Sequence, residues 1–179
     1  MPIKFIFQTP VKVVQMPNHE ELTETILGEI KPTEVARNWT EKKELQDIFN
    51  EEASKFFFEL TGNNLPFIHD LSWLNSSSKY DYTNPHHHGA AFLLGVYYLK
   101  AKGDCGDLIL HDPRGAKNWI KGYENTKGYP MSGRDYYSYS PKEGELVMFP
   151  AYITHHVNPN MTDDIRVSLA INFWSKEYK

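Results

Sequence analysis

Two patterns of apolar residues divide the chain into a helical first part and a strand-rich remainder. A stripe of apolar side chains at steps of three and four residues predicts a helix over about 40–61: Leu45, Ile48, Phe49, Ala53, Phe56, Phe57 and Leu60. Thr40 is the candidate cap at its start, and Gly62-Asn63-Asn64 is the candidate stop. A shorter helix is predicted over 19–29, so a helical buttress is expected over about 19–61.

After Pro66, short runs of β-forming residues alternate with Gly, Pro, Asn and Asp. The predicted strands cover 67–75, 90–100, 107–112, 135–140, 145–149, 152–157 and 165–174. The first fourteen residues add a strand, a turn at Thr9-Pro10 and another strand. Helices followed by many short strands predict a mainly β protein, an antiparallel barrel or jelly roll with a helical layer on one side. Two long loops, 76–85 and 113–134, remain between the strands, and loops of that length are often functional.

Composition and charge narrow the class of protein. The length of 179 residues favours one domain over 1–179, with a β core over about 67–174. The formal net charge of −4 gives no basic surplus, so nucleic acid is not an expected partner. Cys105 is the only cysteine, which excludes an internal disulfide and favours a cytoplasmic protein. No segment approaches the ~18 apolar residues of a membrane-spanning helix. The oligomeric state is not encoded in any pattern that we recognise.

Five of the eight histidines fall in two clusters. In an extended segment His86 and His88 lie on one face, while His87 points the other way. The second cluster places His155 or His156 at the end of a predicted strand, where a barrel could bring it to the first cluster. An isolated run of histidines is more often a polar surface loop. Two clusters beside strong β segments favour one shared metal ion instead.

Arg166 follows the second cluster by eleven residues and begins a strand that continues with apolar residues. It is either a rim residue in a salt bridge with Asp163 or Asp164, or an anion anchor that reaches into the barrel. Because Arg166 and Ser168 share a strand face, a guanidinium fork and a hydroxyl would both be available to a carboxylate. A dicarboxylate co-substrate would fit this pair.

Residues from about 84 to 174 resemble the prolyl-hydroxylase-like branch of the 2-oxoglutarate- and iron(II)-dependent dioxygenases, and the whole chain is similar to a small bacterial and phage family within it. The segments that carry the resemblance are a His-x-His followed by GVYYL, then CGDLILHDPR, PKEGELVMFPAYITHHV and IRVSLAINF, with FIFQTPVKV at the start. The resemblance implies a double-stranded β-helix, which is a jelly roll of the cupin-like kind.

The resemblance also implies roles for particular residues. His86 and His155 match the first and the distal iron ligand. Three residues are implied to hold the far carboxylate of 2-oxoglutarate: Arg166, Ser168 and Tyr98. Trp73 and Asn172 are candidates for the substrate pocket, and Tyr137 is a third candidate because it is one of several tyrosines in loops predicted near the mouth of the barrel.

Position 88 departs from the wider superfamily, which has Asp or Glu where this sequence has a histidine. Three ligand sets are therefore open: three histidines with His88 as the third, two histidines with water, or a carboxylate from elsewhere such as Asp112. We favour the three histidines. They would leave the iron more positively charged than the usual set does.

The activity implied by the resemblance is hydroxylation that uses Fe(II), 2-oxoglutarate and O2, with ascorbate as a supporting reductant. The substrate is expected to be a protein or peptide side chain, as in prolyl hydroxylases, or a small metabolite. The alternative is a cupin-like module that binds metal without catalysis or without 2-oxoglutarate, because many functions share one fold.

Overall fold

The fold is known from a computed structural model that describes residues 8–29, 43–89, 91–114, 136–175 and 177. The chain begins with β1 (Lys12–Gln15), α1 (His19–Glu29) and α2 (Lys43–Thr61). Eight further strands follow: β2 (Phe67–Ser77), β3 (Thr83–His86), β4 (Leu93–Lys100), β5 (Leu108–His111), β6 (Tyr136–Tyr139), β7 (Glu145–Pro150), β8 (His155–Val157) and β9 (Arg166–Ser175). Neither helix is long and apolar enough to cross a membrane.

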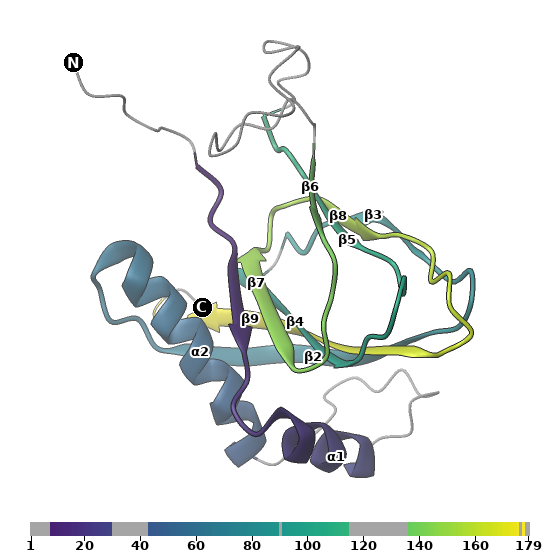
Figure 1. Ribbon diagram of the computed structural model, residues 1–179. Helices are drawn as coiled ribbons and strands as arrows, with labels where there is room; N and C mark the ends of the chain where they lie inside the picture. The colour runs from purple at the N-terminus through teal and green to yellow at the C-terminus, as the bar shows by residue number, and fades with distance from the viewer. Residues whose placement is uncertain (1–7, 30–42, 90, 115–135, 176, 178–179) are drawn as a thin grey trace, which may run out of the picture.

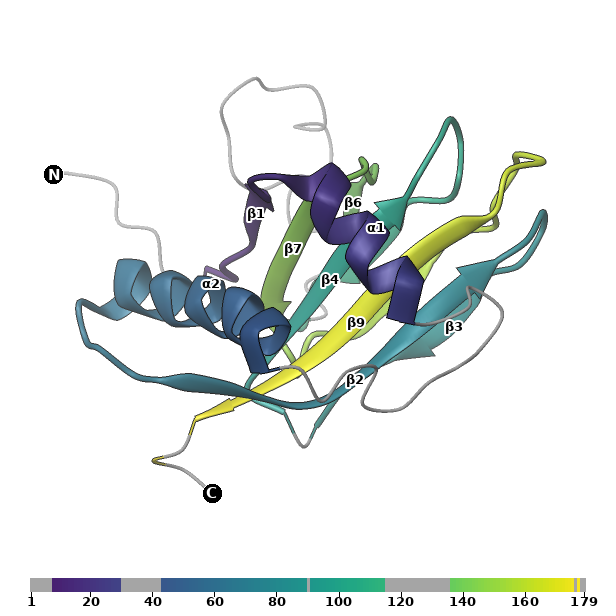
Figure 2. The same cartoon turned by 90° about the horizontal axis from the view of Figure 1, so that it is seen from below.

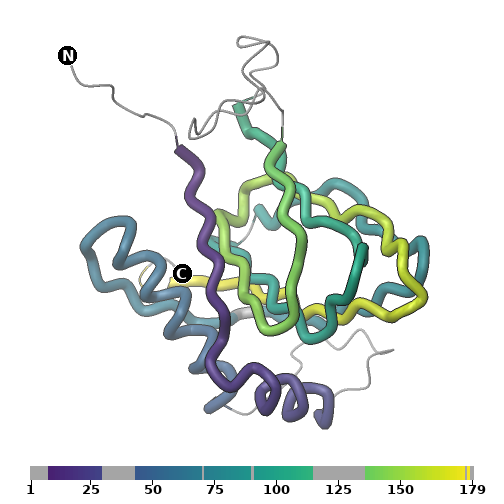
Figure 3. The backbone as a smooth tube through the Cα atoms, in the orientation of Figure 1, coloured from purple at the N-terminus to yellow at the C-terminus, as the bar shows by residue number. Residues whose placement is uncertain are grey.

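The strands form two antiparallel sheets that face each other. The larger sheet has the order β1-β7-β4-β9-β2 and the smaller the order β3-β8-β5-β6. Both helices lie on the outer side of the larger sheet, whereas the smaller sheet lies on its other side (Figures 1 and 2). The backbone trace winds from one sheet to the other (Figure 3). This is the double-stranded β-helix that the sequence predicted.

Alternation along β4 shows how one strand serves two cores. Leu93, Tyr97 and Leu99 pack into a helix-side core together with buried residues of α1 and α2. Leu94, Val96 and Tyr98 point the other way, into an inter-sheet core. Successive strand side chains face opposite sides of a sheet, so a strand buried on both faces is apolar throughout. The inter-sheet face is the one that carries the candidate site.

The predicted helices agree with the structure. The helix over 19–29 is confirmed, and the longer one ends at Thr61 as predicted. Gly62 ends the helix with a φ of 72°, and its N–H donates to the carbonyl of Phe58 at 2.8 Å, as a helix-terminating glycine does. The predicted cap Thr40, the strand within residues 1–7 and most of the loop 113–134 lie outside the described residues.

The predicted strands are confirmed with small shifts at their ends, but one strand was missed. β3 begins within 76–85, where a loop was predicted, and β2 continues to Ser77, so the loop prediction is wrong for 76–77 and for 83–85. The sequence TNPH has weak strand propensity. It is extended because β8 pairs with it, Thr83 opposite Val157 and His86 opposite His155. Tertiary pairing overrides local preference here.

Candidate metal centre

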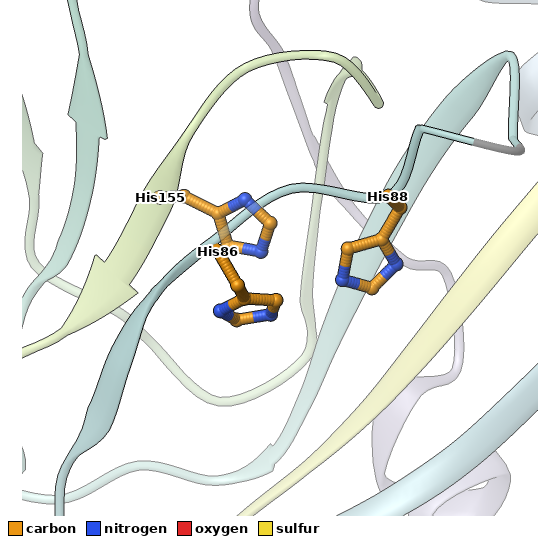
Figure 4. A group of neighbouring side chains, drawn as sticks. All are labelled: His86, His88 and His155. Atoms are coloured by element: carbon orange, nitrogen blue, oxygen red, sulfur yellow. The ribbon is translucent and has the colours of Figure 1, made fainter.

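Three histidines meet between the two sheets. His86 ends β3, His155 begins β8, and the two are direct cross-strand partners. His88 follows β3, and its backbone N–H donates to the carbonyl of Ala151 at 2.9 Å, which holds the segment against the turn after β7. One ring nitrogen of each histidine lies within 4.8 Å of the others. Figure 4 shows the three rings facing a common space.

Each of the three rings has a hydrogen-bond acceptor at Nδ1. His86 Nδ1 lies 2.8 Å from the carbonyl oxygen of Asn84, and His155 Nδ1 lies 2.9 Å from that of Ile153. His88 Nδ1 lies 2.7 Å from Oδ1 of Asn172. An oxygen acceptor requires that Nδ1 carry the proton, so the lone pair of each neutral ring is on Nε2. All three rings are therefore in the tautomer that binds metal through Nε2.

Burial keeps two of these rings neutral. Desolvation lowers the pKa of His155 to about 4, and it also lowers the pKa of His88. A metal ligand must be unprotonated, so neutral rings at pH 7 are ready to bind. Three imidazole nitrogens suit a divalent transition metal, iron(II) among them. The residues present thus fit the metal that the resemblance implies.

A carboxylate does not join the histidine group within the described residues, because no Asp or Glu there meets its distance limit. Asp112, the carboxylate considered from the sequence, is instead bound to Arg114, whose Nε lies 2.8 Å from Oδ1. The hydrogen bonds from Arg114 lower the pKa of Asp112. In the described part of the chain, His88 is the third member of the group.

The neighbouring histidines are directed elsewhere. His87 is exposed, and His156 shares a hydrogen bond with His111 at 2.8 Å between ring nitrogens. His111 and His156 are adjacent to Leu110 and His155, so strand alternation puts both on the outer face of the smaller sheet. The structure thus separates His86 and His155 from the histidines beside them.

Arg166 lies inside the protein and not on its rim. Arg166 is only 3% exposed. One terminal nitrogen of its guanidinium donates to the carbonyl of Cys105 at 3.0 Å, and the other donates to Ser77 Oγ at 2.7 Å. The salt bridge considered with Asp163 or Asp164 is wrong, because Asp163 binds Lys79 and no ion pair of Arg166 occurs among the described residues. Burial lowers the pKa of the guanidinium, although an arginine remains charged. A buried cation of this kind favours an incoming anion.

Ser168 and Tyr98 lie beside Arg166 on the same inner face. Ser168 is two residues from Arg166 along β9. Tyr98, on β4, is the cross-strand partner of Ser168. Both side chains are buried. Desolvation raises the pKa of Tyr98, while the nearby charge of Arg166 opposes that rise. The structure therefore brings together the three residues expected to hold a carboxylate.

Residues 71–172, more than half of the chain, match the model of a family described as "Putative 2OG-Fe(II) oxygenase". The chain belongs to this family of 2-oxoglutarate- and iron(II)-dependent oxygenases. No curated protein matches the sequence.

Solved structures of similar fold include members of the same class. A viral collagen prolyl hydroxylase from Paramecium Bursaria Chlorella virus-1, in complex with 2-oxoglutarate, is 12% identical, with 91% of this chain and 94% of that one covered and a TM-score of 0.60. HygX from Streptomyces hygroscopicus, with nickel and 2-oxoglutarate bound, is 11% identical, with 94% and 83% covered and a TM-score of 0.59.

A third structure, an oxidoreductase of the 2OG-Fe(II) oxygenase family from Burkholderia pseudomallei, is 16% identical with a TM-score of 0.54. It covers 74% of this chain, which spans only 55% of the length of that protein. At these identities the likeness establishes the double-stranded β-helix and not the substrate.

Two of the residues expected in a substrate pocket lie against His88. The rings of Trp73 and His88 are stacked, with centroids 5.3 Å apart and planes 18° apart, and Asn172 accepts the hydrogen bond described above. Tyr137 is the cross-strand partner of Leu110, which in turn pairs with His155. Tyr137 therefore lies on the face of the smaller sheet that is turned toward the larger sheet, and it is 52% exposed. A role for these residues in substrate binding stays a prediction.

Several contacts of these residues could not have been expected from the sequence. Ser77 and the carbonyl of Cys105 hold Arg166, and the carbonyls of Asn84 and Ile153 set two of the histidine tautomers. Backbone acceptors leave no signature in residue type. Only the register of β2 with β9 points to Ser77, since that register pairs it with Arg166.

Proposed function

We propose that this chain is an Fe(II)- and 2-oxoglutarate-dependent oxygenase in which His86, His88 and His155 hold the iron. Two features on the facing sides of the two sheets support the proposal. Three histidine rings present Nε2 to one another, and a buried guanidinium on β9 has no carboxylate partner among the described residues. A 2-oxo acid end can chelate a metal, and a far carboxylate can pair with Arg166. The two features match the two ends of 2-oxoglutarate.

Arg166, Ser168 and Tyr98 would bind the far carboxylate. A guanidinium has five N–H donors, and the bonds to Cys105 and Ser77 occupy the two terminal nitrogens only in part. Those bonds hold the fork in place while its other N–H groups remain for a ligand. The hydroxyls of Ser168 and Tyr98 can add further donors. Since the surroundings are buried, charge-assisted hydrogen bonds here are stronger than at the surface.

When bound, iron(II) with 2-oxoglutarate and O2 supplies the oxidation: 2-oxoglutarate becomes succinate and carbon dioxide, one oxygen atom enters succinate, and the other enters a substrate C–H bond. The protein's own residues position the reactants and exclude water. Phe149 contributes to this, because its ring meets that of His155 edge-on at 5.2 Å within the inter-sheet core. Because Phe149 packs against the His155 ring and excludes water from it, this contact favours one orientation of the His155 imidazole.

The uncharged ligand set has an electrostatic consequence for co-substrate binding. Two histidines and one carboxylate would leave a net charge of +1 on an iron(II) centre, whereas three neutral histidines leave +2. The attraction between unit charges grows as the local dielectric falls. The doubly anionic co-substrate would therefore be held more strongly by the metal in this protein than the usual ligand set would allow.

The proposed reaction is hydroxylation of a protein or peptide side chain, with a small metabolite as the second substrate class. Exposed tyrosines near the metal centre support a peptide. Tyr137 is 52% exposed on the inner face, and Tyr152 is 58% exposed in the turn whose Ala151 carbonyl accepts the His88 N–H. Exposed aromatic rings are common where proteins bind peptides.

Succinate formation tests the oxygenase proposal. Full-length protein with Fe(II), ascorbate and 2-oxoglutarate should release succinate slowly without a primary substrate, as measured by mass spectrometry. Arg166→Gln should abolish 2-oxoglutarate binding and succinate formation. Lys79→Gln removes an exposed cation that pairs with Asp163, and it should leave both unchanged.

Two other outcomes would contradict the proposal in different ways. If neither 2-oxoglutarate binding nor succinate is detected, the protein is a metal-binding module without this activity. If iron binds and oxygen is consumed without 2-oxoglutarate, and Arg166→Gln has no effect, the protein is a cupin-type dioxygenase. The substrate class is tested separately by incubating the active enzyme with proline-containing peptides and with metabolite extracts, and searching for addition of one oxygen atom.

A further inference from the structure

His88 is held by side chains on two of its sides. Asn172 accepts from Nδ1 at 2.7 Å, and the ring of Trp73 stacks on the imidazole with planes 18° apart. Both partners belong to the inner face of the larger sheet, where Asn172 pairs with Leu71 and Trp73 pairs with Ala170. The orientation of the His88 ring is therefore set by neighbouring strands β2 and β9, while the ring itself belongs to the segment after β3.

The other two histidines of the group depend on the backbone instead. His86 and His155 each donate to a main-chain carbonyl two residues earlier, so side-chain substitution leaves their acceptors in place. Among the three rings, only His88 has its tautomer selected by a side chain. A substitution at Asn172 can thus change which nitrogen of the His88 ring carries the proton, and so which nitrogen is available to the metal.

The surroundings of position 88 also fit an imidazole better than a carboxylate. An aspartate there would lack the flat ring that Trp73 stacks upon. Its oxygens would also face Oδ1 of Asn172, which is an acceptor, so that the amide would have to turn over to offer a donor. The Trp73 ring and the acceptor Oδ1 of Asn172 together match a histidine that carries its proton on Nδ1.

We infer that Asn172 is a positioning residue of the metal centre, which selects the Nδ1–H tautomer of His88 and so presents Nε2 to the metal, while Trp73 holds the ring plane. The inference rests on the proposed function in one respect, that the three histidines are the metal ligands. Hydrogen-bonded partners of ligating histidines fix tautomer and orientation, and their loss typically weakens metal binding by about 10- to 100-fold.

The tautomer can be read directly in metal-free protein. Long-range 1H–15N correlation spectra of full-length protein with 15N-labelled histidine should show His86, His88 and His155 with the proton on Nδ1. Asn172→Leu should move His88 alone toward the Nε2–H form. Asn172→Asp keeps an acceptor and should keep the native form. Asn172→Ala makes the same comparison without added bulk, and Asn63→Leu, an exposed asparagine after α2, is the matched control.

Binding of Co(II) alone gives a second readout that does not depend on turnover. Asn172→Leu and Asn172→Ala should bind Co(II) about 10- to 100-fold more weakly than native protein, whereas Asn172→Asp and Asn63→Leu should bind within a few-fold of native. Trp73→Leu should weaken binding more than Trp73→Phe, which keeps a flat ring.

The inference is overturned if His88 keeps its proton wholly on Nδ1 in Asn172→Leu and Asn172→Ala, or if both variants bind Co(II) as tightly as native protein. Failure of the part of the proposed function on which the inference rests, the histidine ligand set, looks different. In that case native protein would bind no metal, yet the tautomer of His88 would still respond to Asn172.

Discussion

His86 and His155 are direct partners across the antiparallel pair of β3 and β8, and their ring centroids lie 4.3 Å apart. The register of these two strands fixes how closely the two rings approach each other. His88 reaches the same space from the segment that follows β3, with its ring centroid 5.2 Å from that of His155. Strand register and the short segment after β3 therefore bring the three rings to one place.

Alanine substitutions at adjacent histidines should separate ligands from neighbours. His86→Ala, His88→Ala and His155→Ala should each lower Fe(II) affinity by more than about 100-fold, since a lost ligand costs more than a lost hydrogen-bond partner. His87→Ala and His156→Ala, whose side chains are directed away from the group, should retain the metal. Bound iron measured by elemental analysis after dialysis checks this. Retention of iron in His88→Ala would favour a two-histidine site.

The metal-free protein should lose stability between about pH 6.5 and pH 4. The pKa of His155 falls from 6.5 to about 4 on burial, so above pH 6.5 the ring is neutral in both the folded and the unfolded state. As the pH falls below 6.5, the unfolded state gains a proton that the folded state does not take up. The difference amounts to about 3 kcal/mol when pH 4 is reached.

Urea unfolding of metal-free native protein and of His155→Asn at pH 7 and pH 4.5 measures this contribution. Carboxylates elsewhere titrate in both proteins, so the difference between the two pH dependences isolates His155. His155→Asn should lose less stability on acidification than the native protein. Equal losses in the two proteins would contradict the expected shift.

Tyr97 and Tyr98 offer a matched pair, because they are adjacent on β4 and face opposite sides. Tyr98→Phe should raise the KM for 2-oxoglutarate by about 10-fold, since it removes one donor that a buried carboxylate would use. Tyr97 instead bonds Thr23 Oγ1 at 3.1 Å on the helix side. Tyr97→Phe should leave that KM unchanged and lower the free energy of unfolding by about 1 kcal/mol. Steady-state kinetics and urea unfolding measure the two effects, and an equal change in KM would argue against Tyr98 as a ligand to 2-oxoglutarate.

Gly106→Ala should be strongly destabilising. Gly106 has a φ of 93°, and a Cβ there would lie 2.1 Å from the carbonyl oxygen of Asn158. The strained backbone alone costs about 1–3 kcal/mol, and the overlap with a main-chain atom adds to it. Gly103→Ala is the control, since its φ is also positive at 60° but its nearest neighbour is a side-chain methyl of Thr162 at 3.2 Å.

Thermal unfolding of the two glycine variants should give a clearly lower Tm for Gly106→Ala than for Gly103→Ala. Because Gly106 follows Cys105, whose carbonyl holds Arg166, the first variant should also bind 2-oxoglutarate more weakly. Similar Tm values would show that the loop can move away from Asn158.

Local patterns in the sequence were sufficient for both described helices and for every described strand except β3, and they named the histidines of the candidate site. The apolar stripe and Gly62 predicted where the longer helix ends, because helix periodicity and a left-handed stop are properties of neighbouring residues. Strand alternation separated His86 from His87 for the same reason. The spacing of Arg166 from the histidines, together with the family resemblance, indicated the chemistry.

Relations between distant segments were decided by the folded chain. The strand at Thr83–His86 exists because β8 pairs with it, and Arg166 is internal because Ser77 and Cys105, far from it in sequence, supply its acceptors. Likewise, Asn172 meets His88 only when β9 lies beside the segment after β3. Such contacts depend on register and strand order, which no window of neighbouring residues contains. For that reason the sequence could name His88 as a candidate ligand, while the partners that orient its ring emerged from the packing of the two sheets.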